Sequence, residues 1–192
     1  MRRSLLGTLS ALALVSLAGC GQATDKTATA AAASEEPSGS TLNAAIGDAA
    51  GMSTLAAALK GTGLNSVFDG TAPYTLLAPQ DGAFGALGDT AKMLTAPENG
   101  AAMVQVLKAH VLPGYMTVAD IEASLTRAKG KPVRMTTMAG GEVTFARTGE
   151  TLTVTAADGS TAKVSGKEIT ASNGVAIPVD AVLKKIPGSS GG

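Results

Sequence analysis

The fold of this chain is decided by the stretch YTLLAPQDGAF, residues 74–84, and by a second stretch, ASNGVAIPVDAVL, residues 171–183. Each contains a short apolar run that favours a strand and is followed by an aspartate. Asp81 can cap a helix over residues 82–87, because its carboxylate accepts the unpaired amide hydrogens of a first helical turn. Phe84 would then enter the core one turn later. Asp180 can in the same way hold nearby backbone amides at the end of its strand.

The sequence before and shortly after the first stretch has helical spacing. Apolar residues recur every three or four positions behind possible N-caps, which predicts helices over about 41–51 and 53–61. Pro97 can open a third helix that carries His110 on its apolar face and ends at Pro113-Gly114. A short helix is expected over 118–125.

The second half of the chain alternates with a period of two. Turn dipeptides containing glycine separate short β-branched runs at 133–138, 142–147, 151–156, 161–164, 167–171 and 175–179. Asn173-Gly174 is suited to a tight turn with positive φ. Pro178 implies an edge position or a local break in the last strand. Helices followed by hairpin-linked strands predict an α+β domain in which N-terminal helices pack on short strands, and not a doubly wound sheet.

Four segments resemble the fasciclin domain family. Residues 74–84 and 171–183 are similar to its two signature segments, and VLKAHVLPG (106–114) and TMAGG (137–141) are similar to stretches between them. Their order and spacing agree over about residues 40–187, which implies a single fasciclin-like domain. The resemblance marks as motif residues with structural roles Pro79, Asp81, Phe84, His110, Pro113, Gly114, Asn173, Gly174 and Asp180.

The N-terminus has the layout of an export signal. Arg2 and Arg3 precede an apolar run at 5–17, and Leu17-Ala18-Gly19-Cys20 resembles the lipobox of bacterial lipoproteins. The resemblance implies cleavage between Gly19 and Cys20 and acylation of the Cys20 thiol, with palmitate-type chains, at an extracytoplasmic membrane face. An ordinary signal that is cut elsewhere is the alternative. The residue after Cys20 is Gly21, whereas an aspartate at this position retains lipoproteins in some inner membranes. The glycine therefore favours the outer membrane, if the host has one.

We therefore expect a signal peptide at 1–19, a flexible tether at 20–39, the domain at 40–187 and a loose tail at 188–192. The chain has 15 basic and 15 acidic residues, and losing Arg2 and Arg3 leaves 13 − 15 = −2. This balance gives no basic field for nucleic acid and no polybasic patch for a membrane surface. Three Phe, two Tyr and no Trp argue against an aromatic binding platform.

No catalytic or metal-binding constellation is evident. His110 is the only histidine, and we expect a buried, hydrogen-bonded side chain, with a ligand contact as the alternative. A catalytic pair of Asp81 and Asp180 is conceivable, but capping explains each aspartate separately. The sequence predicts no enzyme, no cofactor and no metal site.

The family resemblance implies a lipid-anchored adhesion or surface-interaction module that binds protein or polysaccharide partners. Ala109 stands where members implicated in integrin binding have a tyrosine, and Lys167-Glu168-Ile169 replaces their Asp-Ile segment. The frequent histidine of the second signature strand is Ile177 here. These departures argue against integrin-type recognition. The alternative is a periplasmic lipoprotein that binds a small molecule or lipid in envelope maintenance, which an apolar groove between the helical and strand halves would support.

Overall fold

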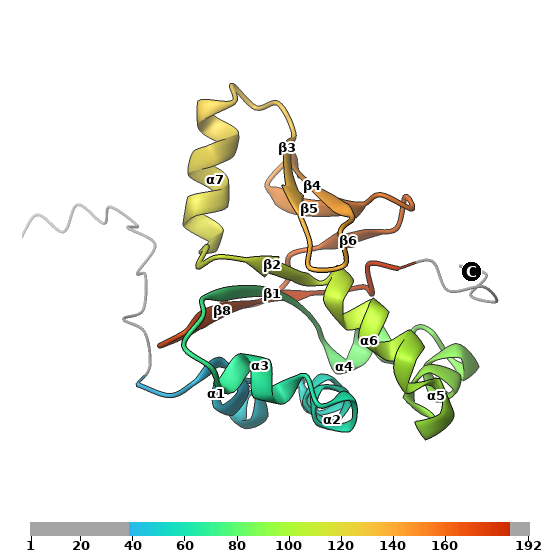
Figure 1. The fold of residues 1–192 in the computed structure, drawn as a ribbon. Helices are drawn as coiled ribbons and strands as arrows, with labels where there is room; N and C mark the ends of the chain where they lie inside the picture. The colour runs from blue at the N-terminus through green and yellow to red at the C-terminus, as the bar shows by residue number, and fades with distance from the viewer. Residues whose placement is uncertain (1–38, 185–192) are drawn as a thin grey trace, which may run out of the picture. The chain divides into compact units, whose positions relative to one another are not determined.

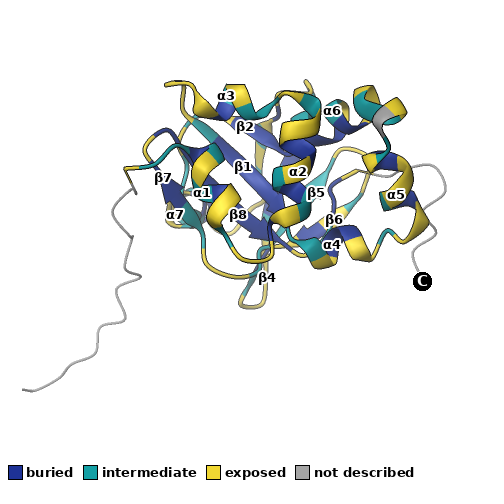
Figure 2. Ribbon diagram, turned by 90° about the horizontal axis from the view of Figure 1, so that it is seen from below, coloured by how far each residue is buried: buried dark blue, intermediate teal, exposed yellow. Residues whose placement is uncertain are grey.

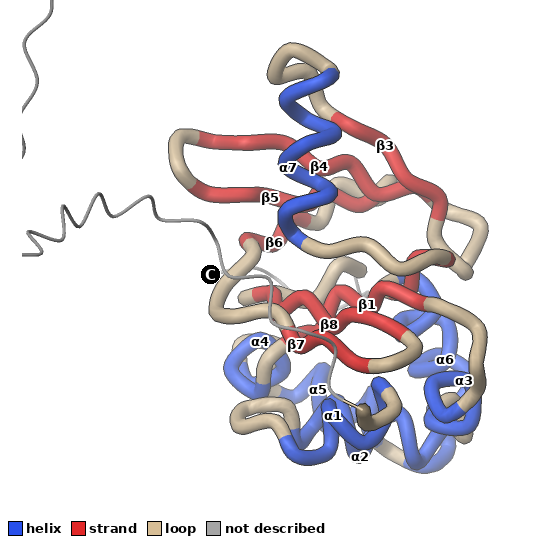
Figure 3. The backbone as a smooth tube through the Cα atoms, turned by 90° about the vertical axis from the view of Figure 1, so that its left-hand side faces the viewer, coloured by secondary structure: helices blue, strands red, loops and turns tan. Residues whose placement is uncertain are grey.

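The structure, a computed structural model, describes residues 39–184. The predicted signal peptide, Cys20, nearly all of the tether and the tail lie outside the described residues. Figure 3 shows three levels: helices at the bottom, one sheet in the middle, and a second sheet with one helix at the top. This arrangement confirms the predicted α+β class.

The helical layer comes from the first half of the chain. Thr41 caps the first helix and accepts a hydrogen bond from the amide of Ala44 at 3.4 Å. The second helix ends at Thr62 and is capped by Gly63, whose φ of 73° is in the left-handed region that glycine adopts at little cost. The layer consists of α1 (Leu42–Asp48), α2 (Ser53–Thr62), α3 (Asn65–Asp69), α4 (Asp81–Gly85), α5 (Asp89–Thr95), a 3₁₀ turn (Pro97–Asn99) and α6 (Gly100–Ala109).

The middle sheet brings the two signature segments together. Its strand order is β2-β1-β8-β7, and it consists of β1 (Tyr74–Pro79), β2 (Val111–Pro113), β7 (Ile169–Ala171) and β8 (Gly174–Val179). Strands β1 and β8 are parallel and in register from Tyr74–Gly174 to Pro79–Val179. Figure 2 shows both as buried. One face packs on the helices and the other on the second sheet, which explains the continuous apolar runs of both strands.

The second sheet is antiparallel and one of its faces is open. It has the order β3-β4-β5-β6, and it consists of β3 (Val133–Thr136), β4 (Glu142–Thr148), β5 (Thr151–Ala156) and β6 (Thr161–Lys163). Phe145 and Val154 pack inward with Ile121 and Leu125 of α7 (Val118–Arg127). None of the helices in residues 39–184 has the length and apolar character needed to cross a membrane.

Several local expectations were wrong. The helix expected from Pro97 to Pro113 is interrupted: Pro97 opens the 3₁₀ turn, α6 stops at Ala109, and Val111–Pro113 forms β2 against β1. Helix α5 was not predicted. Residues Asn173 and Gly174 do not have positive φ, because Gly174 already belongs to β8.

Pro178 is compatible with an interior strand because of where β7 ends. The ladder between β7 and β8 stops at the pair Ile169–Ala176, so β7 does not reach Pro178. On that side the carbonyl of Pro178 accepts a hydrogen bond from the amide of Ser165 at 2.9 Å. The missing amide hydrogen of Pro178 therefore interrupts no bond to β7.

Candidate functional site

Asp81 caps a helix other than the one predicted. Its Oδ1 accepts a hydrogen bond from the amide of Thr54 at 2.7 Å, and its Oδ2 accepts from the hydroxyl of Ser53 at 2.8 Å. Both partners lie in the first turn of α2, whereas α4 has no side-chain cap. The amide of Thr54 is the main cause that lowers the pKa of Asp81. Asp81 thus ties the end of β1 to the start of α2.

Asn173 ties the start of β8 to two helices. Its Oδ1 accepts the amide of Leu42, the first residue of α1, at 2.7 Å. Its Nδ2 donates to the carbonyl of Phe68 at 2.8 Å and also to that of Gly70. The side chain is only 7% exposed, so these bonds satisfy a buried amide that would otherwise be costly.

Gly174 is needed for a close approach between backbones. A Cβ at this position would lie 2.4 Å from the carbonyl oxygen of Tyr74 and 2.8 Å from Cδ2 of Leu42. The parallel pairing of β1 with β8 and the packing of α1 on them therefore require glycine here.

His110 connects α6 to the C-terminal segment. Its side chain is fully buried, Nδ1 lies 2.7 Å from the carbonyl oxygen of Val106, and Nε2 lies 2.8 Å from the amide of Leu183. An amide can only donate, so Nε2 accepts and the proton sits on Nδ1. Burial lowers the pKa of His110 from 6.5 to about 4. The ring is therefore neutral at pH 7 and both of its nitrogens are bonded.

The remaining motif residues also serve the framework. Asp180 Oδ1 accepts the amide of Lys163 in β6 at 2.6 Å. Phe84 is buried in the core on the helical side, and Pro79 ends β1. Pro113 pairs with Tyr74 across β2 and β1, and the amide of Gly114 donates to the carbonyl of Pro73 at 3.0 Å. Asp81 and Asp180 thus bind the backbone of different elements, α2 and β6, and do not form a pair.

Glu168 lies in the segment where the sequence departs from integrin-binding relatives. Its Oε2 accepts the amide of Val118, the first residue of α7, at 2.7 Å. Glu168 therefore stabilises the start of that helix. Within residues 39–184, no group of three or more His, Cys, Asp or Glu side chains could hold a metal ion.

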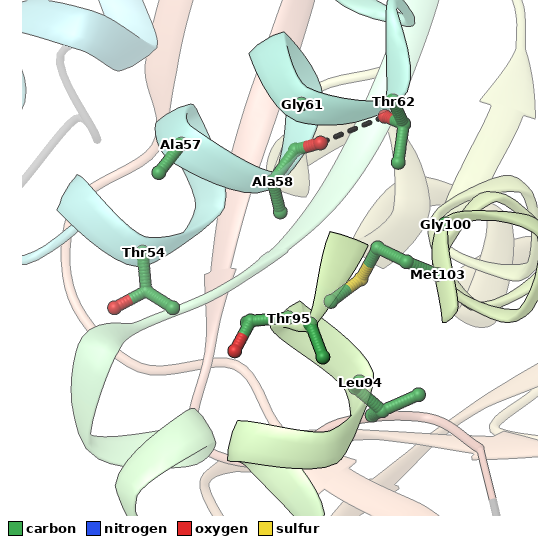
Figure 4. A pocket seen from close by; sticks show the side chains of 10 residues that line it. Thr54, Ala57, Ala58, Gly61, Thr62, Leu94, Thr95, Gly100 and Met103 are labelled. Carbon is green, nitrogen blue, oxygen red and sulfur yellow. Dashed lines mark hydrogen bonds between the residues drawn. The ribbon is translucent and has the colours of Figure 1, made fainter. Parts of the chain in front are cut away.

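A hollow opens in the helical layer between α2, α5 and α6 (Figure 4). Its volume is about 250 Å³, and an apolar surface from Ala57, Ala58, Leu94 and Met103 forms most of its wall. The hydroxyl of Thr62 is directed to the carbonyl of Ala58 at 2.7 Å, so it is already bonded. This hollow lies within the helical layer and not between helices and strands.

A second, more open hollow shares part of that wall. Its volume is about 430 Å³, and it includes Asp81, Lys92 and Thr54. The sequence does not predict either hollow, because both form where separate helices meet. The only local signal was the run of small residues at Ala56–Ala58 and Gly61 in α2.

The comparison with family models identifies the domain. Residues 50–185 match the fasciclin domain model. The chain belongs to the fasciclin domain family. Fasciclin domains are generally non-catalytic and are associated with adhesion-type interactions.

One relative supports this assignment, and one solved structure supports the fold. The chain is 31% identical over 167 residues to Protein sll1483 of Synechocystis sp., a match that covers 84% of this chain and 82% of that protein. It is also similar in structure to a FAS1 domain pair from the insect cell adhesion molecule fasciclin I, with a TM-score of 0.65 and 15% identity. That match covers 76% of this chain and 51% of the other, so this fasciclin domain spans about half of the solved pair.

Proposed function

We propose that this protein is a lipid-anchored, extracytoplasmic adhesion module that binds protein or polysaccharide partners through an exposed face of its fasciclin domain. The observation that carries the proposal is the use of the motif side chains. Asp81, Asn173, His110 and Asp180 all bond to backbone groups of the domain itself. These groups are used to stabilise the fold, so a partner is bound elsewhere on the surface.

The anchor follows from the sequence Leu17-Ala18-Gly19-Cys20. Acylated Cys20 holds the protein at a membrane, and the tether at 20–39 lets the domain reach outward. Many copies displayed on one surface bind a repetitive partner with avidity, which raises a weak individual affinity. Membrane attachment therefore contributes to the mechanism as well as to the location.

Binding of a small apolar molecule is the second candidate, and the hollow between α2, α5 and α6 favours it. Its wall combines Ala57, Leu94 and Met103 with Thr54 and Thr95, and the hydroxyl of Thr95 already donates to the carbonyl of Ala91 at 2.9 Å. A volume of about 250 Å³ lies just below the usual range of ligand pockets, about 300–1,000 Å³. The adhesion function therefore remains the first proposal.

The anchor is tested by the variant Cys20→Ser in the native host. We expect a precursor that is not processed and carries no lipid label. Loss of residues 1–19 at the normal rate in this variant would contradict lipidation.

The adhesion function is tested by surface attachment and cell aggregation with and without the gene product. We expect both to fall in its absence and to recover when the full chain is restored. Unchanged attachment, together with a small molecule that co-purifies with the protein, would favour the second candidate.

A further inference from the structure

A cluster of positive charge lies where α7 leads into β3. Arg127, Lys129, Lys131 and Arg134 are all exposed, and no acidic residue occurs between Glu122 and Glu142. We call these four residues the basic tip. The balanced charge of the whole chain conceals it, because the acidic residues lie elsewhere in the sequence.

Little within the domain neutralises this charge. Arg127 donates to the hydroxyl of Ser124 at 3.0 Å, and its acidic neighbour is the exposed carboxylate of Asp120, whose pKa its charge helps to lower. Arg134 lies 3.9 Å from a carboxylate oxygen of Glu142, at the outer limit of an ion pair. Neither Lys129 nor Lys131 pairs with an acid among residues 39–184. Two ammonium groups are therefore available to an outside partner.

Lys129 occupies a backbone conformation that normally favours glycine. Its φ is 56°, and it is the only non-glycine residue with positive φ in the described part of the chain. The amides of Lys129 and Gly130 donate to the carbonyls of Thr126 and Leu125, both at 2.9 Å, which is a Schellman ending for α7. A cation here costs stability that glycine would not, which supports a use for its charge.

The basic tip lies at the far end of the domain from its first described residue. In Figures 1 and 3, the connection from α7 to β3 is at the top, and α1, which follows residue 39, is at the bottom. The tip also lacks exposed large apolar side chains, which among the described residues are Met93, Tyr115 and Met138.

We infer that the basic tip binds an acidic polysaccharide whose carboxylate groups repeat along the chain, a polyuronate. Charge complementarity selects a polyanion, and the lack of an apolar anchor disfavours a folded protein, whose interfaces depend on buried aromatic or aliphatic residues. The inference rests on the proposed function for its choice of an extracellular partner.

The test measures binding of the full chain, purified in a non-ionic detergent, to immobilised polygalacturonate, with neutral dextran as the reference polymer. The variant Lys129→Gln/Lys131→Gln is compared with Lys60→Gln/Lys163→Gln, which removes the same charge from exposed positions in α2 and β6. Two exposed charge contacts of about 0.7 kcal/mol each predict a Kd raised about tenfold in the tip variant. We expect less than a twofold change in the control variant.

Added salt distinguishes the two variants further. We expect the salt dependence of binding to become shallower in the tip variant only, since fewer counterions are released. Equal losses in both variants, equal binding to dextran, or tighter binding to vesicles of anionic phospholipid than to polygalacturonate would each overturn the inference. Reduced attachment without the gene product, combined with no binding to polygalacturonate, would overturn this inference alone and leave the adhesion proposal standing.

Discussion

The two sheets of this domain differ in how far their residues are buried. Every residue of β8, and every residue of β1 after Tyr74, is buried, because helices cover one face of the middle sheet and the second sheet covers the other. Strand β5 instead alternates, with Leu152 and Val154 buried and Thr151, Thr153 and Thr155 partly exposed. The two strands of the family signature thus lie in the part of the fold that a partner cannot reach.

This contrast separates residues that stabilise the fold from residues that can contact a partner. Substitutions in the middle sheet and its connections should change stability, whereas substitutions around the second sheet and α7 should change binding.

The largest effect is expected for Gly174→Ala. The added Cβ would lie 2.4 Å from a backbone oxygen of β1, so the two signature strands would have to separate. We expect a loss of about 4 kcal/mol or more in the free energy of unfolding, measured with urea. Gly141→Ala is the control, because its nearest atom would be 3.9 Å away, and it should change stability by less than about 0.5 kcal/mol. Similar stability of the two variants would contradict the close approach.

The next largest effect is a loss of folding stability as the pH falls. His110 has a folded pKa of about 4, below the ordinary 6.5, so the unfolded chain takes up its proton first as the pH falls. Its contribution is complete above pH 6.5 and is lost between pH 6.5 and 4, by up to about 3 kcal/mol. The lowered pKa values of Asp81 and Asp120 act in the same direction at still lower pH.

Urea unfolding from pH 7 to 4 tests this prediction. His110→Gln keeps a neutral, hydrogen-bonding side chain and should flatten the curve in that range. A wild-type protein whose stability does not change between pH 7 and 4 would refute the assignment of a buried neutral imidazole.

A smaller loss in the free energy of unfolding is expected for Asp81→Ala, which removes the cap of α2. Three bonds to Ser53 and Thr54 are lost, and a charged cap of this kind contributes about 2 kcal/mol. Asp89→Ala removes an exposed ion pair with Lys92 and an acidic side chain from the first turn of α5, and it should cost less than about 1 kcal/mol. Thermal unfolding of both variants checks the difference, and equal costs would argue against capping.

The smallest expected effect is a gain in stability and not a loss. Lys129→Gly relieves the positive φ at the end of α7 and should raise the free energy of unfolding by about 0.5–1 kcal/mol. Lys131 does not have positive φ, so Lys131→Gly should lower stability slightly, since glycine adds freedom to the unfolded chain. Destabilisation by Lys129→Gly would mean that the lysine is kept for packing and not for charge.

The sequence predicted features that depend on neighbouring residues. Hairpin strands such as β4 and β5 were visible because alternation is a local signal. The partner of Asp81 was missed because Ser53 lies 28 residues earlier, so only the folded chain brings them together. Strand β2 was missed because its three residues are too few to show a period.

The candidate sites were less predictable for a related reason. The hollow between α2, α5 and α6 depends on how three helices meet, and the unexpected α5 provides Leu94 and Thr95. The basic tip could have been found by counting charge over short windows instead of over the whole chain. Its exposure and its separation from α1 required the fold.

Surface attachment of cells that carry Asp81→Ala tests most directly whether the motif residues stabilise the fold without contacting a partner. Asp81 is a motif residue that also lines the more open hollow, so a framework role and a binding role predict different outcomes. At equal surface amounts, and at a temperature where the variant is folded, we expect attachment equal to that of wild type and well above that of cells lacking the protein. Attachment as low as in the deletion would contradict the account, because it would make the Asp81 carboxylate part of the binding site.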